Sequence, residues 1–450
     1  MPLNRRDWLK AFPALAAGTS TILGSWNDRL FAEPQGDKRG AESGVEREFA
    51  SYRAEDRVQS MGIYYRPAGK MPKTAFLITH PRANQMQHFM APRLAAGGYG
   101  VLGQAPRWIN NEINAIQEET LLDVAAGMQY CKQNFGVERF ISIGHSGGGG
   151  LFAFYQVQAT TPPPGRFTST PAGDPPDLNK FNLPPLAAYI SMAAHKGEGR
   201  NVLQWLDPSV VDEDDPLTTE WTLDMYDSRN GYKKPPESSK YSPEFVARFR
   251  AGQMERAKRL DAKAFGIIER QKRARTQMKS AEFAGLDAAQ QMAIRRAAEI
   301  DEYMIIYRTA ADPIMADLSL EPSDRKVGIF AYRDPELANY TEGGISRVMT
   351  ARGYLSTRSG LSTRMLLDEN LAKISVPTLV IGATADNSVP GLKTIQTSYD
   401  AAASKDKTIA WVKGADHGFT PVEPIAGGKD TQAEAARIVL DWTRTRFPAG

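Results

Sequence analysis

The sequence contains a single cysteine, Cys131, in 450 residues, and only five histidines. One thiol excludes an internal disulfide framework and any zinc site built from several cysteines. Neither sign of charge dominates, since 55 Lys and Arg residues stand against 52 Asp and Glu residues, for a formal net charge of +3. This balance gives no reason to expect a nucleic acid or an anionic membrane as the partner.

Long apolar runs are also missing. No segment beyond the N-terminal region approaches about 18 uninterrupted apolar residues, so we expect no stable membrane insertion of the mature chain. Apolar residues still make up 42% of the sequence, which is ordinary for a folded chain and too many for a disordered one. The length fits about three domains, or one α/β core that carries a large insertion.

Residues 1–32 have the pattern of an export address. The Arg5-Arg6 pair precedes an aromatic residue, a leucine and a lysine, and a mildly apolar run follows over residues 11–26. This pattern resembles a twin-arginine (Tat) export signal. We therefore expect cleavage at the end of this segment, residues 33–44 as a polar tether, the Tat translocase as a partner, and a periplasmic or secreted location.

Short apolar runs alternate with longer amphipathic segments over residues 45–160. Such runs are typical of strands that are buried on both faces of a parallel sheet. The alternation predicts βαβ units and a mostly parallel sheet with helices on both faces. We expect strands over 46–52, 58–65, 74–79, 99–102 and 140–143, and helices over 86–96, 113–134 and 148–159.

The alternation stops at Thr160 and resumes near residue 365. Residues 161–364 are first rich in Pro, Gly and Thr, then loop-rich, then strongly helical and charged over 241–308. One further core strand is expected near 186–192. Residues 365–450 then predict helices over 366–374, 389–403 and 431–446 and strands over 377–381 and 408–412. We expect one sheet domain that is split by a large, mainly helical cap insertion.

The pentapeptide Gly-His-Ser-Gly-Gly at 144–148 lies between an expected strand and an expected helix. It has the G-x-S-x-G pattern in the strand–turn–helix context that gives this pattern meaning. The turn is too sharp for side chains on either side of Ser146, hence the flanking glycines. The helix that follows directs its N-terminus at the serine, which favours negative charge there.

A serine hydroxyl is a poor nucleophile unless a base accepts its proton. His145 lies inside the turn and should point away from Ser146, while His80, His88 and His195 lie near other strands. His417 comes directly after the last expected strand, in a segment with glycines on either side. A histidine in that place can reach over the sheet edge, so we assign His417 as the base.

The base needs a carboxylate that fixes its imidazole tautomer. Asp386 follows the strand expected over 377–381 and is our choice. Asp416 is a rival by sequence, although adjacent residues rarely point at each other. Glu198, after the strand expected near 186–192, is a weaker rival.

With these residues in place, the chain resembles the α/β-hydrolase superfamily. The order Ser146, Asp386, His417 matches the Ser…Asp…His order of that family, each residue after the corresponding strand. The resemblance covers residues 45–160 and 365–446 and hardly touches the middle of the chain. It implies the α/β-hydrolase fold and catalysis through an acyl-enzyme.

The resemblance also implies an oxyanion hole made of two backbone N–H groups. Gly147, directly after the nucleophile, supplies one. Many family members carry His-Gly-X in the loop that supplies the other, whereas this chain has His80-Pro81-Arg82. Since Pro81 has no N–H, we assign the second donor to Arg82.

These residues predict an exported serine hydrolase that cleaves a carboxylic ester or a related acyl bond. Peptidase, thioesterase and carbon–carbon hydrolase activities use the same residues on the same fold. A non-catalytic ligand-binding homologue and a membrane-attached interaction protein are the alternatives of another class. No metal or organic cofactor is expected, because no ligand cluster is visible. Seven apolar side chains of the insertion have two interpretations, the lining of a pocket for a bulky or aromatic ester or, more commonly for such residues, the hydrophobic core of the cap itself. They are Trp205, Trp221, Met225, Tyr226, Tyr303, Met304 and Tyr307.

Overall fold

The computed structural model describes residues 44–329, 334–341, 344–345, 347–389 and 391–449. The export signal expected at residues 1–32 therefore lies outside the described residues, as does all but the last residue of the tether expected at 33–44. In the part of the chain that is described, no helix is long and apolar enough to cross a membrane.

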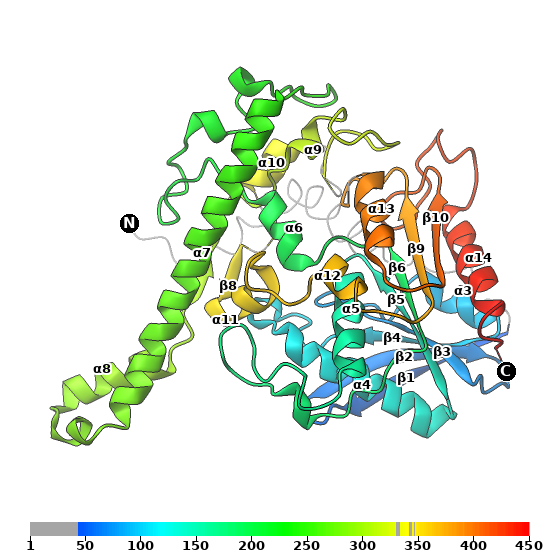
Figure 1. Ribbon diagram of the computed structural model, residues 1–450, viewed down its shortest axis with the longest axis horizontal. Helices are drawn as coiled ribbons and strands as arrows, with labels where there is room; N and C mark the ends of the chain where they lie inside the picture. Colours follow the sequence, from blue (N-terminus) through cyan, green and yellow to red (C-terminus); the bar gives the residue numbers. More distant parts are fainter. Residues whose placement is uncertain (1–43, 330–333, 342–343, 346, 390, 450) are drawn as a thin grey trace, which may run out of the picture. The chain divides into compact units, whose positions relative to one another are not determined.

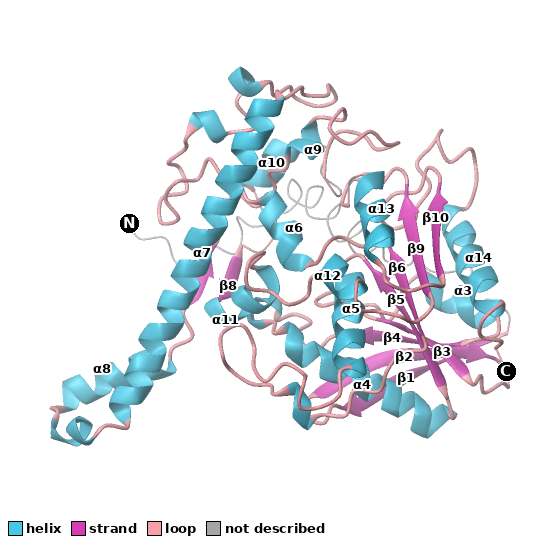
Figure 2. Ribbon diagram, viewed as in Figure 1, coloured by secondary structure: helices cyan, strands magenta, loops and turns pink. Residues whose placement is uncertain are grey.

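Eight strands form one sheet in the order β1-β2-β4-β3-β5-β6-β9-β10 (Figure 1, Figure 2). The β1–β2 and β2–β4 pairs are antiparallel, and all later neighbours are parallel. The strands are β1 (Val45–Arg53), β2 (Gln59–Pro67), β3 (Thr74–Ile78), β4 (Gly100–Ala105), β5 (Arg139–His145), β6 (Ala188–Met192), β9 (Thr378–Ala383) and β10 (Lys407–Val412). This strand order is that of the α/β-hydrolase fold, as predicted.

Helices cover both faces of the sheet because its central strands are apolar on both faces. Along β3, Ala75 and Leu77 pack into one hydrophobic core, and Phe76 and Ile78 pack into the other, as the alternation of side chains along a strand requires. The first face is covered by α4 (Gln117–Phe135), α5 (Gly147–Thr160), α12 (Leu367–Leu371) and α13 (Leu392–Ala401), and the second by α3 (Met90–Ala96) and α14 (Thr431–Arg444).

Two segments of the core differ from the prediction. β4 continues past the apolar run expected over 99–102, because the buried Gln104 amide donates to the Tyr52 hydroxyl at 2.8 Å and to the Asp123 carbonyl oxygen at 3.0 Å. A buried polar side chain that finds partners does not end a strand. Helix α6 (Glu198–Trp205) also lies in a region expected to be loop.

The insertion is mainly helical, as expected (Figure 2). Its longest helix, α7 (Pro243–Met278), begins at the cap residue Ser242, whose hydroxyl accepts the Phe245 N–H, and its buried residues recur at helical spacing. Its other elements include α8 (Ala288–Glu299), α9 (Pro313–Ala316), α10 (Pro335–Tyr340), α11 (Ala351–Gly353), the π-helical turn η6 (Tyr354–Arg358), and the strand pair β7 (Tyr303–Ile305) and β8 (Val348–Thr350). β7 is a strand at the end of a segment expected to be helical.

Candidate active site

Ser146 lies in a strained turn between β5 and α5. Its φ is 56° and its ψ is −124°, a conformation that residues other than glycine rarely adopt. The surrounding backbone leaves no room for neighbouring side chains: a Cβ at Gly144 would lie 2.5 Å from the Gly149 Cα, and one at Gly148 would lie 2.4 Å from the Thr79 carbonyl oxygen. These contacts explain why the turn has glycine on both sides of the serine.

His417 and Asp386 lie in the loops after β10 and β9, and the structure brings them together. The His417 Nδ1–H donates to the Asp386 Oδ2 at 2.8 Å. The Asp386 Oδ1 accepts the backbone N–H groups of Ser388 at 2.7 Å and Val389 at 3.0 Å. With both carboxylate oxygens engaged, Asp386 holds the imidazole in one orientation and with its proton on Nδ1.

The pKa of His417 lies above its ordinary value. Burial disfavours the imidazolium, but the charge and the hydrogen bond of Asp386 outweigh burial, and Asp416 adds a smaller contribution. A carboxylate close to an imidazole stabilises the protonated ring in this way. His417 therefore remains protonated to a higher pH than a free histidine.

The two rival carboxylates have other partners. The Asp416 Oδ1 accepts the Thr420 N–H at 2.8 Å, within its own loop. The Glu198 Oε2 accepts a hydrogen bond from the Arg358 guanidinium. Of the three candidate acids, Asp386 is the one whose carboxylate is hydrogen-bonded to the His417 ring.

Two further histidines connect the serine turn to the His417 loop. The His145 Nε2 lies 2.7 Å from the His417 carbonyl oxygen. The His145 Nδ1 lies 3.0 Å from the His88 Nε2, and the His88 Nδ1 accepts the Met90 N–H at 3.3 Å. These partners assign the proton of each ring to Nε2. His88 thus donates to His145, and His145 donates to the backbone of His417.

Both connecting histidines are neutral at physiological pH. Burial first, and then a neighbouring histidine, lower the pKa of His88 well below its ordinary value and that of His145 to about 3. A neutral ring in a fixed tautomer has one donor and one acceptor, which is what this chain of hydrogen bonds uses. No motif marks His88 in the sequence, and only its contact with His145 reveals its place.

The two predicted oxyanion donors differ in their surroundings. Gly147 is the first residue of α5, where the helix N-terminus favours negative charge. A Cβ there would lie 2.5 Å from the Glu198 Oε1 and 2.8 Å from the His80 Nε2, so a larger residue would displace these two side chains. The Arg82 N–H, in contrast, donates to the His80 Nδ1 at 3.2 Å, and the Ala83 N–H donates to the same nitrogen at 3.1 Å. An oxyanion at Arg82 would have to share its N–H with His80.

A buried polar cluster centred on Glu198 lies against Gly147. The Glu198 Oε1 is 3.8 Å from the His80 Nε2, 3.7 Å from the His195 Nε2 and 3.7 Å from the Arg82 Nε, and its Oε2 contacts Arg358. His80 belongs to the loop that corresponds to the His-Gly-X motif, but no motif points to His195 or Arg358, and Arg358 comes from the insertion. In the described residues, no group of three or more His, Cys, Asp or Glu side chains is arranged to hold a metal ion.

The apolar side chains considered as pocket lining do not gather in one place, and four of the seven belong to hydrophobic clusters of the cap, in line with the interpretation as cap core. Trp221 and Tyr303 are about half exposed, at 46% and 50%. The buried ones belong to three separate hydrophobic clusters. Trp205 lies in the first, Met225 and Tyr226 lie in the second, and Met304 lies in the third. The cap needs hydrophobic cores of its own, and these residues supply them.

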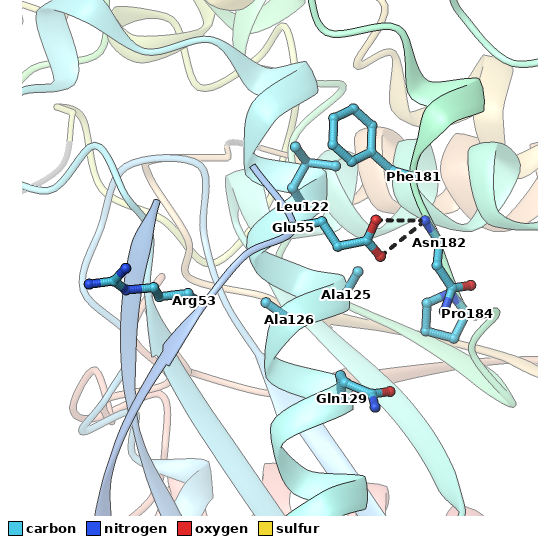
Figure 3. A pocket seen from close by; sticks show the side chains of 9 residues that line it. All are labelled: Arg53, Glu55, Leu122, Ala125, Ala126, Gln129, Phe181, Asn182 and Pro184. Carbon is cyan, nitrogen blue, oxygen red and sulfur yellow. Dashed lines mark hydrogen bonds between the residues drawn. The ribbon is translucent and has the colours of Figure 1, made fainter. Parts of the chain in front are cut away.

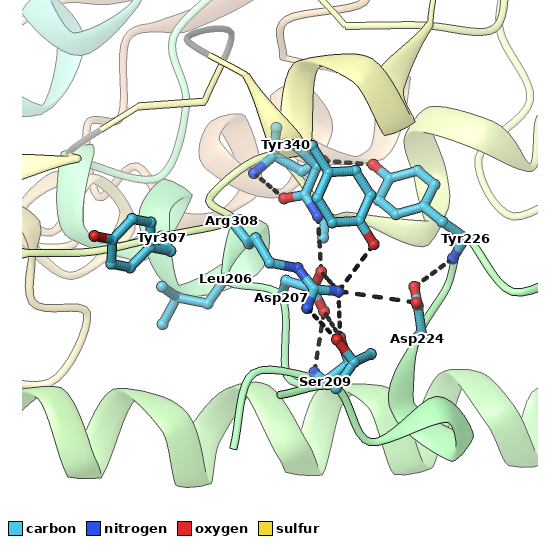
Figure 4. Close-up of polar contacts among 12 residues, drawn as sticks. Leu206, Asp207, Ser209, Asp224, Tyr226, Tyr307, Arg308 and Tyr340 are labelled. Carbon is cyan, nitrogen blue, oxygen red and sulfur yellow. Dashed lines mark hydrogen bonds and ion pairs between the residues drawn. The ribbon is translucent and has the colours of Figure 1, made fainter. Parts of the chain in front are cut away.

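A polar network inside the cap is likewise structural (Figure 4). The Arg308 Nη2 lies 2.8 Å from the Asp207 Oδ2 and 2.6 Å from the Ser209 Oγ, and the Asn339 Nδ2 donates to the Asp207 Oδ2 at 2.7 Å. Arg308 has a φ of 55°, so these bonds hold a strained backbone in place. The network connects segments of the cap that are far apart in the sequence.

A cavity of about 260 Å³ lies beside α4 (Figure 3). Its wall includes Leu122 and Ala125 of α4, and at its edge the Glu55 carboxylate accepts the Asn182 N–H at 3.2 Å and 3.4 Å. None of its lining residues belongs to the serine turn or to the loops of Asp386 and His417. The candidate site is therefore identified by its chemistry and not by the volume of a cavity.

No protein-family model and no curated protein matches the chain. Among solved structures, an esterase domain from Rhodothermus marinus is similar at 10% identity and a TM-score of 0.42, covering 89% of this chain and 98% of that one. An α/β hydrolase from Penicillium sp. sh18 has 12% identity and a TM-score of 0.44, with 89% and 98% covered. An esterase from Pyrococcus furiosus has 12% identity and a TM-score of 0.38, with 89% and 91% covered. The fold assignment rests on the strand order and the serine turn of the chain itself.

Proposed function

We propose that the chain is a serine hydrolase that cleaves a carboxylic ester or a related acyl bond. One observation carries the proposal. His417 is hydrogen-bonded through Nδ1 to Asp386 at 2.8 Å, and its backbone is bonded to His145, the residue before Ser146, at 2.7 Å. A hydroxyl on a strained turn, an imidazole and an orienting carboxylate are the parts that nucleophilic acyl transfer requires.

In the proposed reaction, the Ser146 Oγ attacks the acyl carbon while the His417 Nε2 takes the hydroxyl proton. The new oxyanion faces the Gly147 N–H, at the N-terminus of α5. His417 then returns the proton to the leaving alcohol, and an acyl-enzyme remains. Water attacks the acyl carbon and gives one proton to His417, which passes that proton to the Ser146 Oγ as the carboxylic acid leaves.

A fluorophosphonate probe tests the nucleophile. The probe should label the native protein at Ser146, and Ser146→Ala should abolish both labelling and hydrolysis of a panel of para-nitrophenyl esters. Ser51→Ala, at an exposed position on β1, is the matched control and should keep both. Unchanged labelling of the Ser146→Ala protein would refute the assignment, and ligand binding without turnover of any ester would favour the non-catalytic alternative.

We also propose that residues 1–32 direct export through the Tat pathway, because the twin-arginine pattern and the short apolar run stand together there. Arg5→Lys with Arg6→Lys should retain the full-length chain in the cytoplasm. N-terminal sequencing of the exported native protein should find a start near residue 33. Export of the double variant at the native rate would contradict the proposal.

A further inference from the structure

In the cluster around Glu198, the side chains in contact with one another carry more positive than negative charge. Arg82 and Arg358 both approach this one carboxylate. The side chain of Arg358 is 7% exposed and that of Glu198 is 3% exposed, so the pairing takes place away from solvent. Glu112 is the other carboxylate that acts on both guanidinium groups, but it forms no ion pair with either within the described residues.

The two histidines of the cluster add no charge. The His80 Nδ1 accepts the Arg82 N–H, and the His195 Nδ1 accepts the Gly197 N–H at 3.2 Å, so the remaining proton of each ring is on Nε2 and faces Glu198. Burial lowers the pKa of His80 well below its ordinary value and that of His195 to about 3. One carboxylate and two guanidinium groups therefore leave a surplus of one positive charge.

Both guanidinium groups also have unused donors. The Nε of Arg82 and the Nε of Arg358 are buried and have no hydrogen-bond partner in the described part of the chain. A buried donor without a partner costs free energy, and this cost is larger for a charged group. An anionic ligand would supply both the missing acceptors and the missing charge.

The cluster lies where a substrate would be held. The Glu198 carboxylate and the His80 ring lie against Gly147, directly after Ser146. The Arg82 side chain is 37% exposed, in contrast to the 3% of Glu198, so this part of the cluster reaches solvent. A planar carboxylate matches the paired N–H groups of a guanidinium.

We propose that Arg82 and Arg358 bind a carboxylate of the substrate, so that the preferred substrate is an ester with a free carboxylate close to the scissile acyl group. The inference rests on the proposed hydrolase function and names its substrate class. Glu198 is a positioning residue that holds both arginines. With substrate bound, the charges of the two guanidinium groups are balanced by two carboxylates, that of Glu198 and that of the substrate.

Matched ester pairs test the substrate class. Mono-para-nitrophenyl succinate, glutarate and adipate are each compared with the corresponding methyl para-nitrophenyl diester, which has the same scissile bond and no charge. We expect kcat/KM to favour the anionic member of at least one pair by about tenfold or more. Equal rates within every pair would overturn the inference while leaving the hydrolase proposal intact.

Arginine variants test the residues. Arg358→Gln and Arg82→Gln should each reduce the anionic-to-neutral ratio of kcat/KM by about tenfold, whereas Arg358→Lys should retain part of it through its charge. Arg200→Gln is the control, because it removes an exposed arginine of α6 that lies 3.4 Å from Glu369 and outside the cluster. An unchanged ratio in both glutamine variants would contradict the assignment. Because both kcat/KM values fall in proportion when part of the protein is inactive, their ratio is unaffected by such a loss.

A binding measurement keeps the test independent of turnover. Titration calorimetry of the Ser146→Ala protein with sodium glutarate should give saturable binding that Arg358→Gln weakens and that dimethyl glutarate does not reproduce. If no ester is hydrolysed and no probe labels Ser146, the hydrolase proposal fails, and glutarate binding still decides whether the carboxylate site exists. Absence of binding together with absence of ester selectivity would end the inference.

Discussion

At the scale of single residues, the candidate site depends on which nitrogen of His417 carries the proton. Asp386 determines this, because its Oδ2 accepts from the His417 Nδ1 at 2.8 Å while Ser388 and Val389 hold the other oxygen. The acceptor nitrogen is then Nε2, the one that a general base needs. The carboxylate has a second effect, since it also raises the pKa of the ring against the effect of burial.

Replacing Asp386 with Asn should remove both effects. We expect kcat/KM of the native protein to rise with pH through a pKa above 6.5, since the base must be neutral and its pKa is raised. In Asp386→Asn, activity should fall on the order of ten-thousandfold, and the apparent pKa should move down because burial remains and the carboxylate charge is gone.

The control for this substitution is Asp416→Asn. It keeps an oxygen to accept the Thr420 N–H, so its activity should stay close to native, with a slightly lower apparent pKa because Asp416 contributes less to the shift. The pH profiles of kcat/KM for the three proteins decide the matter. Native-like activity of Asp386→Asn would show that another group orients His417.

Sequence reasoning reached the residues that follow a recognisable strand and missed those defined only by contact. Ser146, Asp386 and His417 each come after an apolar run that marks a buried strand, so the sheet itself predicts their common edge. Arg358 has no such marker: it lies in a π-helical turn of the insertion and contacts Glu198, 160 positions away. A single sequence contains no signal for a contact of that kind.

At the scale of elements, the parallel strands were predictable because both of their faces are buried. The runs at 74–79, 140–143 and 377–381 became β3, β5 and β9 with small changes at their ends. The short helix α6 was not predictable, because its first residue, Glu198, is a charged residue in a buried position. Its ion pair with Arg358 overrides the polarity that otherwise suggests a loop.

Three elements meet through the histidine chain, and this contact is expected to position the base. His88 precedes α3, His145 ends β5, and the His417 carbonyl belongs to the loop after β10. His145→Leu removes the N–H that donates to this carbonyl. We expect kcat to fall by about tenfold with little change in KM, and the inflection of the pH profile to stay in place because the Asp386 contact remains.

His145→Gln is the matched variant, since its amide can replace the N–H that points at the His417 carbonyl. It should recover most of kcat. Steady-state kinetics of both variants at several pH values make the comparison, with melting temperatures to confirm folding. Equal losses in the two variants, or a loss confined to KM, would mean that His145 only fills space.

At the scale of the whole molecule, the insertion has hydrophobic cores and polar networks of its own. Its helical character was predictable from composition, since α7 and α8 fall within 241–308. Its internal arrangement was not, because it depends on pairings such as Asp207 with Arg308 and Asn339. The sequence could not decide between pocket lining and core for Trp205 and Met225 for a similar reason: an apolar residue in a cap looks the same in sequence whether it lines a cavity or fills a core.

The cap network should also make stability depend on pH. Asp224 lies 3.8 Å from Arg308, and its pKa is raised to about 6, first by burial and then by Asp207. A carboxyl whose pKa is higher in the folded state binds protons more tightly there, so it stabilises the fold at low pH, and this contribution is lost as the pH rises through about 4 to 6.

The substitution Asp224→Asn tests this dependence, because asparagine stays neutral and keeps the oxygen that accepts the Tyr226 N–H. The melting temperature of the native protein relative to Asp224→Asn should therefore fall between pH 4 and pH 7, by the equivalent of at most about 3 kcal/mol. Asp227→Asn removes a nearby carboxylate whose pKa is instead lowered to about 2 by its bonds to Arg229, and should show no such fall. If the difference in melting temperature between the native protein and Asp224→Asn stays constant across this range, ionisation of Asp224 does not affect the stability of the cap.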